Sequence, residues 1–290
     1  MEIIETLING LSSGGTYAMI ALGYTMVYGI AKMLNFAHGD IIMVGGYMIY
    51  VTMAALGNPI IGLIAAIVFC VLLGISIEKI AYKPLRGASP LAVLITAIGV
   101  SYLLQSTAQM IFGSSPKMVI VADLGNLTLG GLKIPYDTVI TLVCSFAIML
   151  VLSIFVKYTK IGRAMIAVSE DRGAASLMGI NVNGIITITF AIGSALAAVA
   201  GFFMLMKSPS LSNTLGAMPG IKAFTAAVIG GIGSIPGAML GGILMGVVEA
   251  ISFKITVIAP YTDAIEFLIL IIILLVRPSG ILGKKRREKV

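Results

Sequence analysis

The chain has 290 residues, of which 59% are apolar and only 11% are charged, and it contains no tryptophan. Soluble proteins average about 25% charged residues, so this composition excludes water as the main solvent of the chain. The formal net charge of +7 need not indicate a nucleic-acid partner, because Lys and Arg gather in the cytoplasmic loops of membrane proteins. We therefore expect a lipid bilayer, and no nucleic acid, as its surroundings.

Apolar stretches long enough to cross a bilayer follow one another along the chain. A hydrocarbon core about 30 Å thick requires about 20 apolar residues per helix, and these stretches lack the alternation typical of membrane strands. The sequence predicts an all-α polytopic membrane protein, a bundle of about eight transmembrane helices within a range of roughly seven to nine. The expected spans lie near residues 10–30, 39–56, 60–78, 90–112, 137–156, 184–206 and 262–276.

Basic residues predict the orientation of this bundle. Three strongly basic connections lie at 79–86, 157–172 and 284–287. The positive-inside bias places all three in the cytoplasm, and alternation then puts the N-terminus outside, the C-terminus inside, and Lys207, Lys222 and Lys254 on the outer side. An even number of crossings, none or two, must separate Lys207 from Lys254. The Gly-rich region 218–252 is therefore either a re-entrant segment or two short helices.

We expect one domain over residues 1–290, because no internal repeat, low-complexity linker or second soluble domain is visible. A cytoplasmic loop at about 157–183 and a basic cytoplasmic tail at 277–290 belong to it. Glu2 and Glu5 stand where a secretory signal would carry cationic residues, which predicts no removable signal peptide.

No energy source or catalytic set is visible in the chain. A G-x-x-x-x-G-K-[ST] loop is absent, and no cofactor site is predicted. Cys70 and Cys144 lie in apolar runs and His38 is the only histidine, so we expect neither a metal site nor a nucleophile with its base. The interior carboxylates and histidines of a proton-driven carrier are also not apparent. We predict that the chain is not an enzyme and that it does not bind ATP through such a loop.

A polar segment interrupts the first two apolar runs at Asn35, His38 and Asp40. One interpretation is a cytoplasmic turn in which Asp40 favours the N-terminus of the next helix. The other is a broken helix that positions polar groups beside a translocation path, because irregular backbone at membrane depth must line a cavity or be buried in protein. Glu249, at the end of a later apolar run, is a further candidate for this path or for a contact with water or a partner.

Glycines recur at intervals of four within the Gly-rich region. They are Gly233, Gly237 and Gly241, and then Gly242 and Gly246. Small residues at this spacing allow helices to approach closely in lipid, and Pro236 can bend or end a helix. The pattern predicts close helix packing, with a re-entrant element at a subunit interface or beside a pore as a compatible alternative.

The cytoplasmic loop carries the most informative motif. Gly162 and Arg163 are followed by Glu170 and Asp171, and then by a short amphipathic helix that we expect to end at Gly179, a residue type that caps helices. Its apolar face consists of Ala174, Ala175, Leu177 and Met178. This face has nothing to bury against unless a partner supplies a groove.

These segments together resemble the LivH-type permease of high-affinity branched-chain amino acid ABC transporters, over essentially the whole chain. The matching segments are Gly23–Ile30, Asn35–Asp40, Gly162–Ala164, Lys222–Gly242 and Arg277–Gly283. The resemblance implies a multi-pass permease of the bacterial inner membrane that moves leucine, isoleucine or valine inward. It also implies four kinds of partner: a second related permease, two cytoplasmic ATPases, an extracytoplasmic binding protein and the lipid around them.

Permeases of ABC importers commonly carry an E-A-A-x-x-x-G element that docks on the ATPase. Ala174, Ala175 and Gly179 fall at the matching positions, but Gly173 stands where the Glu would be. The resemblance therefore implies docking through this loop, with the acidic pair just before it as a replacement for the missing Glu. Related permeases for other amino acids, amides or urea stay open as alternatives, as does a self-sufficient ion-coupled carrier.

Overall fold

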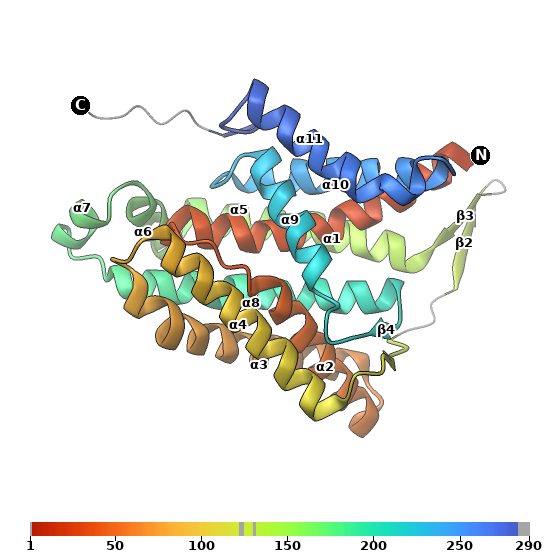
Figure 1. Cartoon of the computed structure of the whole chain (residues 1–290), viewed down its shortest axis with the longest axis horizontal. Coiled ribbons are helices and arrows are strands. Elements are labelled where there is room, and N and C mark those ends of the chain that lie inside the picture. The colour runs from red at the N-terminus through yellow and green to blue at the C-terminus, as the bar shows by residue number, and fades with distance from the viewer. Residues whose placement is uncertain (1, 122–124, 130–131, 284–290) are drawn as a thin grey trace.

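Long helices that run back and forth along one axis make up most of the chain (Figure 1). The computed structural model describes residues 2–121, 125–129 and 132–283. The helices are α1 (Glu2–Ala31), α2 (His38–Leu56), α3 (Pro59–Ile77), α4 (Pro90–Phe112), α5 (Tyr136–Tyr158), α6 (Lys160–Glu170), α7 (Arg172–Leu177), α8 (Val182–Lys207), α9 (Ala217–Gly230), α10 (Ile235–Lys254) and α11 (Thr262–Val276).

Short elements complete the described part of the chain. A π-helical turn, η1 (Glu78–Tyr82), and a 3-10 turn, η2 (Lys83–Leu85), extend α3, and a second 3-10 turn, η3 (Ala259–Tyr261), precedes α11. The strands are β1 (Lys117–Met118), β2 (Asn126–Leu129), β3 (Leu132–Pro135) and β4 (Ser210–Leu211). β2 and β3 form an antiparallel hairpin, and β1 pairs antiparallel with β4.

The predicted spans correspond to helices, and the all-α membrane fold is confirmed. Within the described residues, seven helices are long and apolar enough to cross a membrane. α1 is not among them, although its 30 residues would extend about 45 Å. It lies in the middle of the bundle, packed against α5, α8, α9 and α10. Because other helices surround α1, it does not need the apolar surface that lipid requires of the outer helices.

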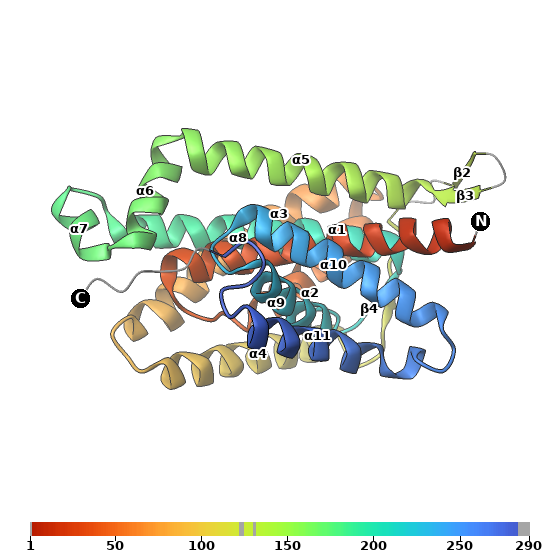
Figure 2. The same ribbon diagram turned by 90° about the horizontal axis from the view of Figure 1, so that it is seen from above.

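The outer helices are the apolar ones. Figure 2 shows α5 along one side of the bundle and α4 and α11 along the other, with α1 between them. Less than a fifth of each of these three helices is buried, and they expose large side chains such as Leu103, Val151 and Leu275. Such surfaces are unfavourable in water and suit lipid or another membrane subunit.

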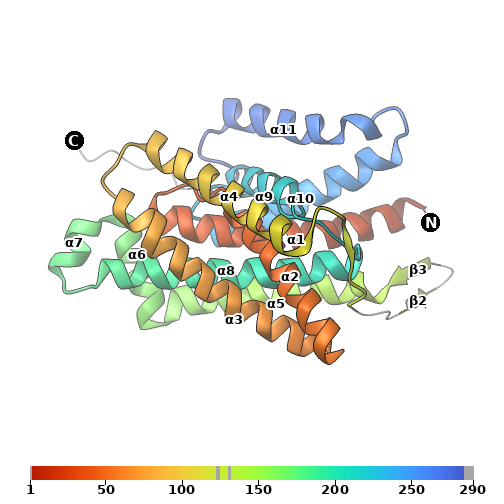
Figure 3. The same cartoon turned by 60° about the horizontal axis from the view of Figure 1, so that its bottom comes forward.

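The two ends of the bundle differ in their charges and connections. The start of α1 and the β2–β3 hairpin lie at one end, and the α3–α4 connection, α6 and α7 lie at the other (Figures 1 and 3). The second end therefore gathers the basic connections at 79–86 and 157–172. The third basic segment, 284–287, lies outside the described residues. This arrangement agrees with the predicted alternation of the spans.

The Gly-rich region folds as two helices, α9 and α10, joined by a tight turn. α9 has 14 residues, while the 20-residue α10 is long enough to span. Side chains on Gly237 and Gly241 would collide with the α9 backbone, and side chains on Gly242 and Gly246 would collide with α1. The two alternating pairs therefore let α10 pack closely against two helices at once.

Gly233 has a different role from the one predicted by the spacing. Nothing lies within 4 Å of the position that its Cβ would occupy, and its φ of +92° is in the left-handed region. It belongs to the turn between α9 and α10, where glycine adopts a conformation that other residues rarely reach. Assigning Gly233 to helix packing was wrong, because the helix begins two residues later, at Ile235.

Candidate functional site

The polar break between α1 and α2 lies inside the bundle. Asn35, His38 and Asp40 are each at most 2% exposed, and a side chain on Gly23 would collide with the His38 ring. Gly23 is eight residues before the end of α1, which is about 12 Å along the helix. Residues 32–37 therefore turn back beside α1 before α2 begins. The cytoplasmic-turn interpretation is wrong, and the break has the buried, irregular backbone that the alternative required.

Each polar group of this break meets a different helix. The Tyr82 hydroxyl, on η1, donates to Asn35 Oδ1 at 2.8 Å, and Gln105 Nε2, on α4, donates to Asp40 Oδ1 at 2.8 Å. The His38 ring packs edge-on against Tyr24, with the centroids 4.7 Å apart. Its Nε2 atom has no hydrogen-bond partner within the described residues. The break is thus fastened by side-chain hydrogen bonds to two other helical segments, and the His38 ring is buried between them.

Glycines allow the start of α2 to cross the start of α9. A side chain on Gly216 would collide with the carbonyl of Gly39, and a Cβ on Gly220 would lie 3.0 Å from the Cα of Gly39. Both helices begin at this crossing in the interior of the bundle. Half-helices that start at membrane depth direct their positive N-terminal ends into the protein, a feature of transporter sites.

A cluster of charged side chains lies beside the first turns of α9. Lys222 Nζ is 2.7 Å from Glu249 Oε1, 2.8 Å from Asp263 Oδ1 and 3.2 Å from Glu266 Oε2. The Tyr17 hydroxyl donates to the same Glu249 oxygen at 2.8 Å. The cluster joins α1, α9, α10 and α11, and its one ammonium group faces three carboxylates.

This cluster corrects two predictions. Lys222 is not an outer-surface charge, because its side chain is only 7% exposed, and Glu266 is fully buried. The interior also contains the ionisable groups that the apolar runs had not suggested. A usable signal was present in the spacing of Asp263 and Glu266, which are three residues apart and therefore lie on one face of a helix.

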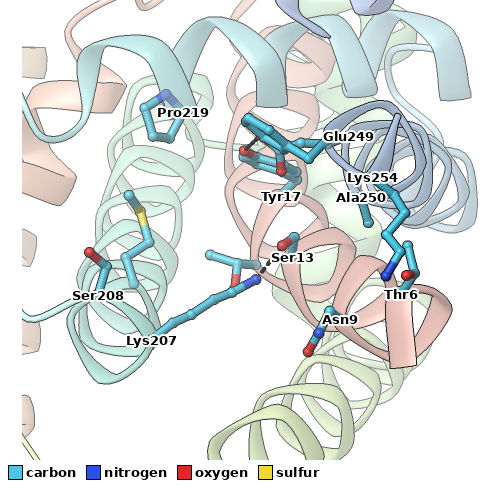
Figure 4. A pocket seen from close by; sticks show the side chains of 13 residues that line it. Thr6, Asn9, Ser13, Tyr17, Lys207, Ser208, Pro219, Glu249, Ala250 and Lys254 are labelled. Atoms are coloured by element: carbon cyan, nitrogen blue, oxygen red, sulfur yellow. Dashed lines mark hydrogen bonds between the residues drawn. The ribbon is translucent and has the colours of Figure 1, made fainter. Parts of the chain in front are cut away.

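A cavity of about 690 Å³ adjoins this cluster between α1, α8, α9 and α10. One wall is the face of α1 formed by Thr6, Asn9, Ser13, Thr16 and Tyr17. Figure 4 shows Lys207 reaching Ser13 from α8, and Glu249 next to Tyr17. Its volume is in the range of small-molecule sites. The cavity brings together groups that no linear motif connects.

The helix α7 has the predicted glycine cap at its end and also a side-chain cap at its start, which was not predicted from the sequence. The Asp171 side chain accepts a hydrogen bond from Ala174 N at 2.9 Å at its start, and Gly179, with φ +80°, follows its end. Ala175 is buried, whereas Leu177 and Met178 are 91% and 82% exposed. The predicted apolar face is therefore divided: Ala175 packs inward, and two large side chains project from the tip.

A half-buried arginine joins α7 to the helix break. The Arg172 guanidinium donates to the carbonyls of Ala31 and Ile30, the last residues of α1. Burial, followed by the positive charge of Arg86, lowers the pKa of Arg172. Arg86 is itself paired with Glu78 and bonded to Asn183, at the start of α8. The end of α1 is thus held by the same segment that projects from the bundle.

Comparison with known proteins decides the family. Residues 6–274 match the family described as branched-chain amino acid transport system, permease component. The chain belongs to this permease family. It is 44% identical to the high-affinity branched-chain amino acid transport system permease protein BraD of Pseudomonas aeruginosa, across 99% of this chain and 98% of that one. It is 42% identical to the permease protein LivH of Salmonella typhimurium, across 100% and 98% of the two chains.

A solved structure, PsaBC from Streptococcus pneumoniae in complex with Fab, shares 19% identity with this permease, covering 96% of this chain and 91% of that one. The TM-score is 0.46, a likeness too weak to carry an argument.

In this permease the predicted residues fall into separate places. Asn35, His38 and Asp40 meet at the helix break, but Glu249 belongs to the charged cluster on the other side of α9. On α9, Gly220 packs against the break and Lys222 pairs with Glu249. The loop residues Gly162, Arg163, Glu170, Ala174 and Gly179 all lie on or beside α6 and α7. Sequence spacing had given no sign that Arg172 connects the loop to the break.

Proposed function

We propose that the chain is the membrane-spanning permease subunit of an ATP-binding-cassette importer that moves leucine, isoleucine or valine into the cytoplasm. Its partners are a second related permease, two cytoplasmic ATPases and an extracytoplasmic binding protein, in the inner membrane of a bacterium. The N-terminus lies outside and the C-terminus inside. The observation that carries this proposal is the 44% identity to a branched-chain amino acid permease protein, which extends across 99% of the chain.

The cytoplasmic end of the bundle supports an ATPase contact through α6 and α7. Leu177 and Met178 project from α7 with most of their surface exposed, although exposing large apolar side chains in water is unfavourable. A groove on an ATPase would cover them, in the way that amphipathic helices dock into grooves. Nucleotide binding by the ATPases then shifts the permease between inward-facing and outward-facing states.

Pathway residues are proposed at the helix break. Asn35, His38 and Asp40 organise irregular backbone next to the starts of α2 and α9, and such breaks line substrate routes in transporters. The backbone there is attached to the end of α1, so a movement of α7 is transmitted to it through Arg172.

Reconstitution tests the proposal. Proteoliposomes contain this chain, the partner permease and the two ATPases, with binding protein outside and ATP inside, and labelled leucine uptake is measured while one component at a time is omitted. The proposal requires uptake that stops with each omission. Uptake of an amide or urea, with no uptake of leucine, isoleucine or valine, would reassign the substrate and retain the importer.

An ion-coupled carrier is the second candidate, and the buried cluster around Lys222 is the observation that favours it. Ionisable groups inside a membrane protein often mark ion or proton routes. This candidate predicts uptake by the chain alone, abolished by collapsing the ion gradient with an ionophore and unaffected by removing ATP. The importer predicts the opposite result for both treatments.

A further inference from the structure

The cavity beside Tyr17 has the chemical features of a binding site. Thr6, Asn9, Ser13 and Tyr17 follow one another at intervals of three or four residues along α1, which places them on one face of the helix, and all four line the cavity. A polar stripe facing lipid would be costly at this depth. The stripe instead faces a space large enough for a small molecule.

Charged side chains of both signs reach this space: Lys207 and Lys254 are basic, and Glu249 is acidic. Lys207, at the end of α8, donates to the neutral Ser13 hydroxyl, so its charge is not neutralised by that contact. Glu249, on α10, accepts hydrogen bonds from both the Tyr17 hydroxyl and the Lys222 ammonium group at the same oxygen, Oε1. A purely structural ion pair would bring Lys207 and Glu249 into direct contact, yet the salt bridges of the described residues pair Glu249 with Lys222 and not with Lys207.

The separation of the two charges suits a zwitterion. Ser13 and Tyr17, the α1 residues that they contact, are four positions apart, which is about 6 Å along the helix. The ammonium and carboxylate groups of an amino acid can bridge that interval with one hydrogen bond at each end. Met204, Pro219 and Phe253 supply an apolar part of the lining, which an aliphatic side chain would cover.

We propose that this cavity is an acceptor site for a zwitterionic amino acid with an apolar side chain, held by Glu249 at its ammonium and by Lys207 at its carboxylate. The site is at the end of the bundle where α1 begins and α8 and α10 end. The choice of substrate rests on the proposed function, and the proposal adds a place for it within the permease. An importer that relied on its binding protein alone would have no need of opposed charges here.

The head group of phosphatidylethanolamine offers the same pair of charges as an amino acid, an ammonium and an anion. The test therefore includes both sources. The complete complex of permeases and ATPases is placed in nanodiscs with and without phosphatidylethanolamine, in the absence of binding protein. Cys70 and Cys144 are replaced by Ala, and Asn9→Cys supplies one thiol in the cavity.

The measurement is the rate at which a membrane-impermeant thiol reagent labels Asn9→Cys. Leucine is expected to slow labelling about fivefold, while 4-methylpentanoate, which lacks the ammonium, and isoamylamine, which lacks the carboxylate, leave the rate unchanged. Lys207→Gln and Glu249→Gln are each expected to raise the leucine concentration needed for protection about tenfold, the loss of one charge-assisted hydrogen bond. Lys117→Gln, a matched change on β1 at the same end of the bundle, is expected to leave protection unchanged.

Lys207 is exposed, so its variant folds even if the Glu249 variant does not. The proposal is overturned if leucine gives no protection, if both analogues protect equally, or if phosphatidylethanolamine alone protects the thiol. Those results leave the proposed function intact as long as the unmodified complex imports leucine with its binding protein. Absence of that import with normal protection by leucine would instead overturn the importer and keep the site.

Discussion

The Arg172 guanidinium donates to the carbonyl of Ala31, the last residue of α1, and to the carbonyl of Ile30 at 3.3 Å. Arg172 begins α7, the helix with the exposed apolar tip, and Ala31 directly precedes the buried break that contains Asn35 and His38. A charged donor on the last carbonyls of a helix is stabilising because these carbonyls have no partner within the helix. The contact therefore ties the exposed helix α7 to the interior of the bundle.

Replacing Arg172 by Ala is expected to uncouple ATP hydrolysis from transport. The ATPases still bind and hydrolyse nucleotide, but α7 moves without moving the end of α1. The amount of leucine imported per ATP should therefore fall about tenfold, as expected for losing a charge-assisted hydrogen bond. Arg172→Lys keeps the charge without the forked geometry of the guanidinium, so its leucine import per ATP should lie between the values of the unmodified chain and Arg172→Ala. Uptake and phosphate release are measured on the same proteoliposomes. Lys160→Ala serves as the control, and an equal loss in both variants would contradict the prediction.

Gly173, in α7, and Gly179, just after it, form a matched pair for testing the proposed docking role of this helix. At Gly179 the φ of +80° is strained for any residue with a Cβ, which costs about 1–2 kcal/mol, so Gly179→Ala should distort the end of α7 and weaken ATPase assembly. Gly173 has helical geometry, and its Cβ would contact Asp171 at 3.3 Å, so Gly173→Ala should have little effect. Co-purification of the ATPases with each permease variant measures their assembly. Equal amounts of ATPase retained by Gly179→Ala and Gly173→Ala would refute the docking role of the cap.

Lys222 is expected to be essential for folding because it is the one described counter-charge for three carboxylates in its cluster. Lys222→Met leaves Glu249 and the fully buried Glu266 without this partner, and breaking a buried pair costs about 3–5 kcal/mol. Adding Glu266→Gln to that variant should restore part of the loss, since it removes one uncompensated charge. Thermal exposure of the buried Cys70 to a thiol-reactive dye gives the unfolding temperature. If adding Glu266→Gln did not raise the unfolding temperature of Lys222→Met, the side chains of the cluster would not be energetically coupled.

Gly246 marks the closest approach of α10 to α1. A Cβ there would overlap the backbone of Gly14, so Gly246→Val must separate the helices and is expected to lower stability by about 3 kcal/mol. Gly99, in the middle of α4, has nothing within 4 Å of its Cβ position, so Gly99→Ala should be neutral or slightly stabilising. The unfolding temperatures of Gly246→Val and Gly99→Ala are compared through the labelling of Cys70 by the thiol-reactive dye. Similar unfolding temperatures for the two variants would show that α1 and α10 tolerate separation.

Much of the fold was predictable because it depends on short-range properties of the chain. The apolar stretch expected at 90–112 is the helix α4, and the stretch expected at 262–276 is α11, since the length and composition of a span are local features. The cap at Gly179 was also visible in the sequence, because a glycine after a short amphipathic run readily adopts the left-handed conformation that ends helices. The family resemblance, which rested on motifs along the whole chain, was confirmed.

Other features depend on which helix faces meet, and a single sequence does not contain that information. The chain gives Lys222 and Glu249 as isolated charges 27 residues apart, and only the packing of α9 against α10 makes them an ion pair at 2.7 Å. The polar segment after α1 reads equally well as a surface turn. Its burial follows from Gly23 and Gly39, which leave room for the returning backbone.

The sequence by itself therefore determined that this is a helical membrane permease and where most of its apolar helices lie, because hydrophobicity, charge and motif spacing act over a few residues. The tertiary structure alone decided that the helix break is buried, that Arg172 holds the end of α1, and that Lys207 and Glu249 face one cavity. Each of these depends on contacts between segments distant in the chain, where glycine positions and helix crossings fix which side chains come within hydrogen-bonding distance.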